Sequence, residues 1–395
     1  MKNLLSLFLF IIPLQVIHAQ QDIKDLYRQL ELSLAQRNIA SQRKEARIDS
    51  IQNLITLDMS AQKLFDHYYT LYQEYLTYRS DSAFFYIDKA EEIASRTNIL
   101  KQKHLCYISR ATVLATTGYF SQALSQLQHI DRASIDSTLL ADYYEAYEWV
   151  YSVWSEYTDD EYYAPHYRKK EILYNDSLLQ VLPPGSNEYY YWTGEYKART
   201  GDQEGAQKAY EKALKGIPVN TRLYACITCG LAFAHSRQGH LQELERYLIL
   251  SAISDNVCPL KENLSLQELA LYIYRQKTQS MEQANRYLQY SMEDATFYNN
   301  RLRMLEIARK IPAIFNAYQQ ENIDAKHHLT AAVIFISALS LLLIASIVFI
   351  RRQLRQVNKA QHSLKELNEQ LCHLNDELFK TNHTREEYVS LFLDL

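Results

Sequence analysis

Cys226 and Cys229 form a C-x-x-C pair, the first spacing in this chain that could carry chemistry. Such a pair is a redox site when it opens a helix after a strand, and it can help hold zinc when two more ligands are available. Here the pair falls inside a predicted helix, and His235 and His240 are merely nearby. We expect buried thiols or a structural disulfide, with no metal and no cofactor.

No other spacing in the chain is typical of catalysis. We find no glycine-rich phosphate loop, zinc-protease helix or nucleophile elbow. His383 follows a predicted coiled coil, where a sensor kinase carries its phosphate-accepting histidine, but the surrounding residues KTNHTREEY lack the context of such a site. We expect His383 to be a solvated helix residue, no catalytic residues, and a protein that is not an enzyme.

The amino-acid composition predicts the secondary structure in which these residues lie. The 395 residues include only 8 Gly and 7 Pro, which favours long helices, and 47% are hydrophobic. The net charge of -4 argues against a basic nucleic-acid binder. The 32 Tyr residues suit half-buried seams between helices and adaptable binding surfaces. The predicted fold class is all-α.

A repeated pattern is clearest in residues 187–220, NEYYYWTGEYKARTGDQEGAQKAYEKALKGIPVN. Its landmarks, in order, are Gly194, Gly201, Asp202, Ala206, Tyr210, Ala213, Leu214 and Pro218. This segment resembles a tetratricopeptide repeat, a pair of antiparallel helices. Alignment on Gly201 predicts further hairpin turns at Ser80, Gly118, Asp159, Gly239 and Gln279. Five or six stacked hairpins predict a right-handed solenoid with a concave face.

The first helix of each hairpin lines the groove in this repeat family, and the resemblance places aromatic and charged residues there. They are Trp149, Val153, Glu156, Tyr157, Tyr191, Glu195, Arg199, Phe233, Arg237 and Lys277. Such a mixture suits a protein, peptide or glycan partner. Trp149, Val153 and Phe233 could equally serve only in packing. If Arg199 binds the ligand, Arg199→Glu should abolish the response and leave thermal stability unchanged.

An uncharged stretch of 22 residues, 329–350, matches the thickness of a bilayer as one transmembrane helix. Arg351, Arg352, Arg355 and Lys359 follow it, so the positive-inside rule places the C-terminus in the cytoplasm. Residues 1–19 have one Lys, an apolar run and Ala19, which predicts a cleaved signal peptide, with a retained anchor as the alternative. We therefore expect a single-pass inner-membrane protein with a periplasmic N-terminal part.

A heptad seam follows the predicted span. Apolar residues alternate at steps of three and four: Val357, Ala360, Leu364, Leu367, Leu371, Leu374 and Leu378. This pattern predicts a short parallel coiled coil and a homodimer, although one amphipathic helix on another domain would show the same spacing. Residues 351–395 contain seven basic and seven acidic residues. Their net charge is zero, so this segment has no excess positive charge for direct nucleic-acid binding.

The predicted segments are a signal peptide (1–19), an N-terminal helical cap (20–59), tetratricopeptide-like repeats (60–298), a capping and juxtamembrane helix (299–328), the span (329–350), the coiled coil (351–380) and the start of a cytoplasmic domain (381–395). The sequence ends on the apolar run EEYVSLFLDL, so we expect that domain to be truncated here.

This layout, with KEARIDSIQNL, SDSAFFYIDKAEEIA, VLPPGSNEYYYW, EDATFYNNRLRMLEIARKIP and REEYVSLFLDL, resembles a family of bacterial membrane regulators with a cytoplasmic domain of unknown function. The resemblance implies transmembrane signalling directed towards transcriptional regulation. A membrane-tethered scaffold for envelope assembly and a truncated sensor kinase are the alternatives.

Overall fold

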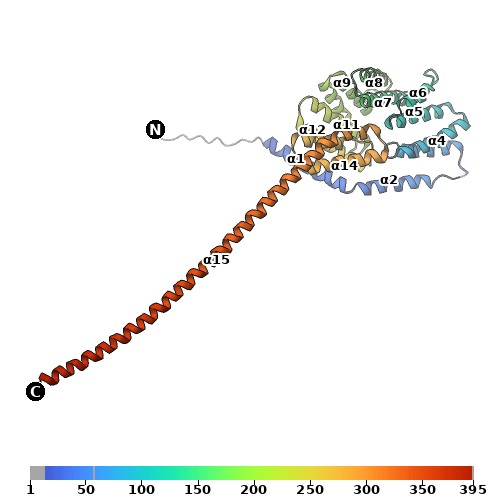
Figure 1. Cartoon of the computed structure of the whole chain (residues 1–395). Coiled ribbons are helices and arrows are strands. Elements are labelled where there is room, and N and C mark those ends of the chain that lie inside the picture. The colour runs from blue at the N-terminus through green and yellow to red at the C-terminus, as the bar shows by residue number, and fades with distance from the viewer. Residues whose placement is uncertain (1–13, 57, 394–395) are drawn as a thin grey trace, which may run out of the picture. The chain divides into compact units, whose positions relative to one another are not determined.

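The computed structural model describes residues 14–56 and 58–393, and every regular element in these ranges is a helix (Figure 1). The elements are α1 (Leu14–Ala35), α2 (Arg37–Gln52), α3 (Ala61–Tyr75), α4 (Ser80–Thr97), α5 (Leu100–Thr116), α6 (Phe120–Gln128), the 3₁₀ helix η1 (Ser137–Leu139), α7 (Leu140–Thr158), α8 (Ala164–Leu179), α9 (Asn187–Thr200), α10 (Gln203–Leu214), α11 (Arg222–Arg237), α12 (Leu241–Val257), α13 (Ser265–Gln276), α14 (Met281–Tyr298) and α15 (Arg301–Leu393).

Local sequence signals set many of these helix ends. The side chains of Ser60, Ser186, Thr221 and Ser280 each accept a hydrogen bond from a backbone N–H in the first turn of the helix that follows. These N-caps satisfy donors that the helix cannot pair internally. Gly201 ends α9 with a φ of 96°, a left-handed conformation that glycine adopts without strain.

The helices from α3 to α14 pair into six consecutive antiparallel hairpins. The turns of these hairpins lie at or beside the six positions from Ser80 to Gln279 that the sequence alignment gives. Neighbouring hairpins pack on one another, because each buries its apolar face against the next. The predicted all-α, tetratricopeptide-like solenoid is confirmed.

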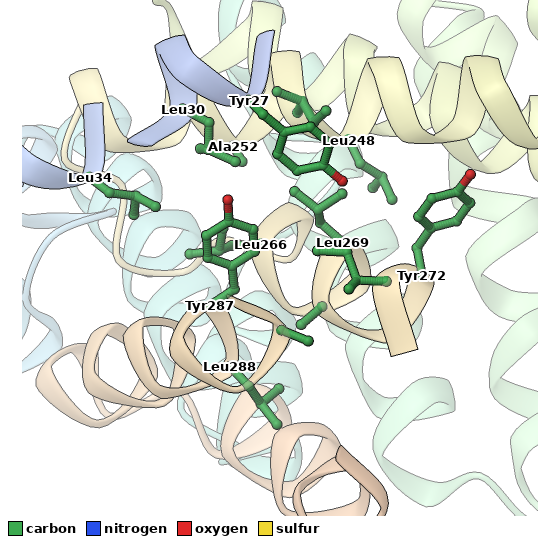
Figure 2. Packing of buried hydrophobic residues seen from close by; sticks show 14 of the residues in the cluster. Tyr27, Leu30, Leu34, Leu248, Ala252, Leu266, Leu269, Tyr272, Tyr287 and Leu288 are labelled. Carbon is green, nitrogen blue, oxygen red and sulfur yellow. The ribbon is translucent and has the colours of Figure 1, made fainter. Parts of the chain in front are cut away.

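The N-terminal helices contact both ends of the repeat array. Ile48 of α2 is buried with Leu71 of the first hairpin, whereas Leu30 and Leu34 of α1 pack into a cluster with residues of α12, α13 and α14 (Figure 2). In the same region Tyr27 Oη donates a hydrogen bond to Glu245 Oε1 at 2.7 Å. Periodicity within α1 marks its apolar face but does not identify which distant helix covers that face.

The first hairpin also meets the end of the repeat array. Ser80 Oγ donates to the carbonyl of Tyr298 at 2.5 Å, and Tyr298 Oη donates to the carbonyl of Leu76 at 2.8 Å. The backbone N–H of Lys261 donates to the carbonyl of Thr77 at 2.8 Å. The repeat array therefore closes on itself through contacts between residues about two hundred positions apart.

Helix α15 belongs to two compact units, one that ends at Gln319 and one that begins at Gln320. Its apolar stretch is exposed and is long and apolar enough to cross a membrane, which makes it a candidate span. The seam residues Val357, Leu364, Leu367, Leu371, Leu374 and Leu378 are also exposed in this chain. Most of the predicted signal peptide lies outside the described residues.

Candidate functional site

The start of α15 packs against the part of α7 where the sequence predicts a binding groove. Leu302 of α15 is buried in a cluster with Phe120 and Val153, and Trp149 packs against the same cluster. The indole N–H of Trp149 donates to Thr116 Oγ1 at 2.9 Å. The chain's own helix therefore covers Val153, and Trp149 and Val153 act in packing.

An ion cluster lies beside this contact and joins α7, α8 and α9. Arg199 approaches Glu156 at 3.1 Å through Nη2 and Glu171 at 2.7 Å through Nε. The Glu171 side chain is fully buried, whereas Glu156 and Arg199 are partly accessible. Because an unpaired buried carboxylate is costly, Arg199 has a structural role in this cluster.

Arg303 extends the ion cluster into α15. Its Nη1 atom lies 2.8 Å from Glu306 and 4.0 Å from Glu156, and only 10% of its side chain is exposed. Gln267 of α13 donates to the same carboxylate of Glu306 at 2.7 Å. The first two turns of α15 thus connect α7 with α13 through an ion pair and a hydrogen bond.

Burial dominates the electrostatics of the acids in this region. Desolvation raises the pKa of Glu171, and the nearby guanidinium of Arg199 opposes that rise. Glu148 is buried, and desolvation together with the charge of Glu171 raises its pKa well above the ordinary value. These carboxyl groups therefore hold protons at a higher pH than exposed glutamates do.

Two further predicted groove residues contribute to packing. Glu195 accepts a hydrogen bond from the hydroxyl of Tyr210 at 2.7 Å, and Tyr210 is buried between α9 and α11. Tyr191 is half-buried against Trp192 and Tyr210, and desolvation raises the pKa of its hydroxyl. Both residues therefore help to hold α9 against α10 within one hairpin.

The remaining predicted groove residues are more accessible. Tyr157 is 40% exposed, and its ring contacts Phe120 beside the start of α15. Phe233 is half-buried in α11, Arg237 is exposed at the end of α11, and Lys277 is exposed in the turn after α13. Of this group, the structure brings only Tyr157 next to the Phe120–Val153–Leu302 contact.

Two acidic residues of α7 are exposed to solvent and still have raised pKa values. Glu145 is exposed to solvent, yet desolvation raises the pKa of its carboxyl, and Arg222 opposes the rise. Asp142 shows the same combination, with repulsion from Glu188 as a second cause. Both carboxyl groups therefore keep their protons to a higher pH than free carboxyl groups do.

The cysteine pair is not activated. Cys226 and Cys229 are both free thiols in the structure. Burial raises the pKa of Cys226 to about 12 and also raises the pKa of Cys229, so neither is a thiolate near neutral pH. Among the described residues, no group of three or more side chains of the metal-ligating types includes either cysteine.

A charged cavity that the sequence did not reveal lies between the turn after α7 and the start of α15. Its volume is about 590 Å³, and Glu156, Asp159, Arg168 and Arg309 are among its lining residues. Arg309 Nη1 lies 2.8 Å from Asp159 Oδ2, and Lys310 Nζ lies 2.5 Å from Glu268. The acidic run 159–161 is visible in the sequence, but its pairing with α15 depends on the tertiary fold.

The stacked helical hairpins define a tetratricopeptide-repeat protein, a class that mediates protein interactions and is typically non-catalytic. Residues 34–309 match the family described as the SusR N-terminal TPR domain, and the chain belongs to that family. A search of curated proteins gives no match. The chain is similar in structure to a thermophilic tetratricopeptide-repeat protein of Thermus thermophilus, with 15% identity, a TM-score of 0.37 and coverage of 51% of this chain and 92% of the other.

Proposed function

We propose that this chain is a non-enzymatic transmembrane signalling protein. Its repeats bind a protein, peptide or glycan partner in the periplasm, and α15 passes the bound state through the inner membrane to a dimeric coiled coil. The output is a regulatory one, directed towards transcription. The interaction domain and the candidate span support this proposal.

The observation that carries the proposal is the position of the start of α15. Leu302 and Arg303 pack against α7 beside accessible Tyr157, and the same helix continues into the apolar stretch. A ligand that prefers one arrangement of α7 and α15 shifts the equilibrium by its difference in affinity for the two states. Binding energy in the groove thus acts directly on the helix that leaves it.

Photo-crosslinking in the full-length protein tests this function. A photoreactive phenylalanine analogue replaces Tyr157, and the protein in native membranes is irradiated and its adducts are identified by mass spectrometry. The matched control carries the analogue at Leu173, which is 52% exposed on α8. We expect one dominant periplasmic adduct at position 157 and none of it at position 173.

The captured partner then provides a second measurement. Adding it in purified form to the full-length protein in nanodiscs should change hydrogen exchange in residues 301–310. Equal capture at both positions, or binding that leaves the exchange of this segment unchanged, contradicts coupling through α15 and favours a membrane-tethered scaffold.

A further inference from the structure

Acidic side chains gather along one side of α7 and one side of α9. Asp142, Glu145 and Glu148 follow one another at intervals of three residues in α7. Glu188 and Glu195 are seven positions apart in α9. Because residues at these spacings lie on the same side of an α-helix, each helix presents a row of carboxyl groups. We call these five side chains the acidic face.

The two rows lie beside each other, because α7 and α9 meet at a nearly constant offset along the chain. Arg199 of α9 donates hydrogen bonds to Ser152 Oγ at 3.4 Å and to Glu156 Oε1 at 3.1 Å, and these partners precede it by 47 and 43 positions. The same offset places Glu195 next to Glu148. Repulsion from Glu195 is accordingly among the causes that raise the pKa of the Glu148 carboxyl.

The cations that act on the acidic face are engaged with other carboxylates. Arg199 Nε lies 2.7 Å from Glu171, and Arg222 Nη2 at the start of α11 lies 2.9 Å from Glu262. Within the described part of the chain, none of the five acids of the face forms an ion pair. The protein therefore leaves the negative charge of this face without a cation of its own.

Glu148 is the residue of the face that points to a ligand. It is only 4% exposed, and its carboxyl group has no hydrogen-bond or ion-pair partner among the described residues. Buried polar groups without a partner are rare in folded proteins, because burial removes water and nothing replaces it. An unpartnered carboxyl beside four other acids is suited to a positively charged group supplied from outside.

We propose that the acidic face binds a basic segment of a protein partner, with a lysine ammonium or an arginine guanidinium held between Glu148 and Glu195. The exposed carboxyl groups of Asp142 and Glu145 are available to further basic side chains of that segment. This inference rests on the proposed function and names the class of partner that the repeats take.

The chemistry of the face favours a cation over the other partners. Hydrogen bonds between cationic donors and carboxylates are stronger than those between neutral groups. An acidic segment is repelled by the same five side chains, and an uncharged glycan offers hydroxyl donors but no charge to offset theirs. Only a basic segment neutralises the face and supplies a donor to the buried carboxyl of Glu148.

Binding of a cation is coupled to the loss of a proton. Desolvation and repulsion from neighbouring acids raise the pKa of Glu148 well above its ordinary value, so the carboxyl releases a proton to solvent when it pairs with the cation. The affinity should therefore increase with pH. The charged and titratable groups around Glu148 are Glu145 on its own helix, Glu171 on α8, and Tyr191, Glu195 and Arg199 on α9.

Fluorescence anisotropy with the full-length protein in phosphatidylcholine nanodiscs tests the proposal. The probe is a labelled peptide in which Ala alternates with Lys, and the matched peptides have Gln or Glu in place of Lys. Empty nanodiscs give the lipid background. At physiological ionic strength we expect the Lys peptide to bind at least about tenfold more tightly than the Gln peptide, and more tightly at pH 8 than at pH 6.

Variants of single acids locate the site. Glu148→Gln keeps the size of the side chain and should weaken binding of the Lys peptide about tenfold and reduce its dependence on pH. Glu204→Gln, at a side chain that is 79% exposed on α10, changes the net charge equally and should leave the affinity unchanged. Glu145→Gln should weaken binding severalfold, and because Glu145 is exposed it tests the face even if Glu148→Gln does not fold.

The outcomes separate this inference from the function on which it rests. Equal affinity for the Lys and Gln peptides, or equal losses in Glu148→Gln and Glu204→Gln, overturns the acidic face as a binding site. Displacement of the Lys peptide by an equal concentration of spermidine assigns the face to small polyamines and overturns the partner class. In each case a periplasmic adduct at Tyr157 still supports the proposed function. Binding at Glu148 that leaves hydrogen exchange in residues 301–310 unchanged supports the site and contradicts the coupling through α15.

Discussion

At the scale of single residues, burial decides which charged side chains serve structure. Arg199 and Arg237 both lie near the ends of helices in equivalent repeat positions, and both are candidates for a binding groove on sequence grounds. Arg199 is enclosed with Glu171 and Glu156, whereas Arg237 is exposed. Only the second of these can be replaced without leaving a buried carboxylate unpaired.

We therefore expect Arg199→Met to lower the free energy of unfolding by about 2 to 3 kcal/mol, because Glu171 loses its nearest cation. Urea denaturation of the full-length protein in detergent measures the loss. Arg237→Met is the control and should change stability by less than about 0.5 kcal/mol. The same cluster makes Arg199→Glu destabilising, rather than a change in ligand response alone.

The double variant Arg199→Met, Glu171→Gln isolates the electrostatic cause. Removing the carboxylate should recover part of the lost stability. The loss in Arg199→Met alone should become smaller as pH falls, because protonation removes the charge of Glu171. Equal losses in the single and double variants would show that packing, and not charge, is responsible.

The buried carboxyl group of Asp255 makes the stability of the fold depend on pH, and the direction of this dependence can be stated. It is buried and accepts a hydrogen bond from Ser265, and desolvation raises its pKa from 3.8 to about 7. A carboxyl group whose folded pKa is raised favours the folded state while protonated, and this contribution is lost as pH rises towards 7. The slope is at most about 1.4 kcal/mol per pH unit.

We expect Asp255→Asn to be more stable than the parent at pH 8 and close to it at pH 4. Thermal unfolding of both proteins from pH 4 to pH 8 checks this difference. Because other buried acids titrate equally in both chains, a difference in stability that does not grow with pH would contradict the assignment to Asp255.

At the scale of elements, close contact between hairpins depends on glycine. The buried ring of Tyr210 lies against Gly194 of α9 and Gly230 of α11. A Cβ atom at Gly194 would lie 2.5 Å from Cε1 of Tyr210, and one at Gly230 would lie 2.7 Å from Cζ. The small residues of the repeat pattern thus make room for the aromatic ring that fills the interhelical space.

Gly194→Ala should lower the free energy of unfolding by about 1 to 3 kcal/mol, since the clash outweighs the better helix propensity of alanine. Lys208→Ala on the exposed face of α10 is the control and should be nearly neutral. If the ring contact is responsible, Tyr210→Leu should reduce the cost of Gly194→Ala when the two are combined.

At the scale of the whole molecule, contacts between distant parts of the sequence organise the repeat unit. Helix α1 packs on α12, the first hairpin contacts the end of α14, and α15 begins against α7. The last of these contacts matters for signalling because the same helix contains the candidate span.

Leu302→Asp should release the start of α15 without unfolding the hairpins, since it removes about 2 kcal/mol of apolar burial from the contact with Phe120 and Val153. Hydrogen exchange of the full-length protein in detergent should rise in residues 301–310 and stay unchanged in the α9–α10 hairpin. Asn316→Asp, at an exposed site on α15, is the control. Unchanged exchange in residues 301–310 would contradict this role of Leu302.

The sequence by itself determined the helices, the hairpin turns and the apolar stretch. These follow from local rules: Gly201 ends α9, Ser186 caps it, and the period of the apolar residues marks each buried face. The stacking of the hairpins also followed, because Gly194, Tyr210 and Ala213 are characteristic of one kind of repeat.

The tertiary structure alone decided which residues share a site. Arg199 meets Glu171 from a neighbouring hairpin, and Arg303, more than a hundred positions later, reaches Glu156. The spacing of residues along the chain does not predict these contacts, because they depend on how the repeat array curves and closes. The same curvature places Arg199 between two glutamates and leaves Tyr157 accessible, which is why the residues predicted to line a groove include both structural and available side chains.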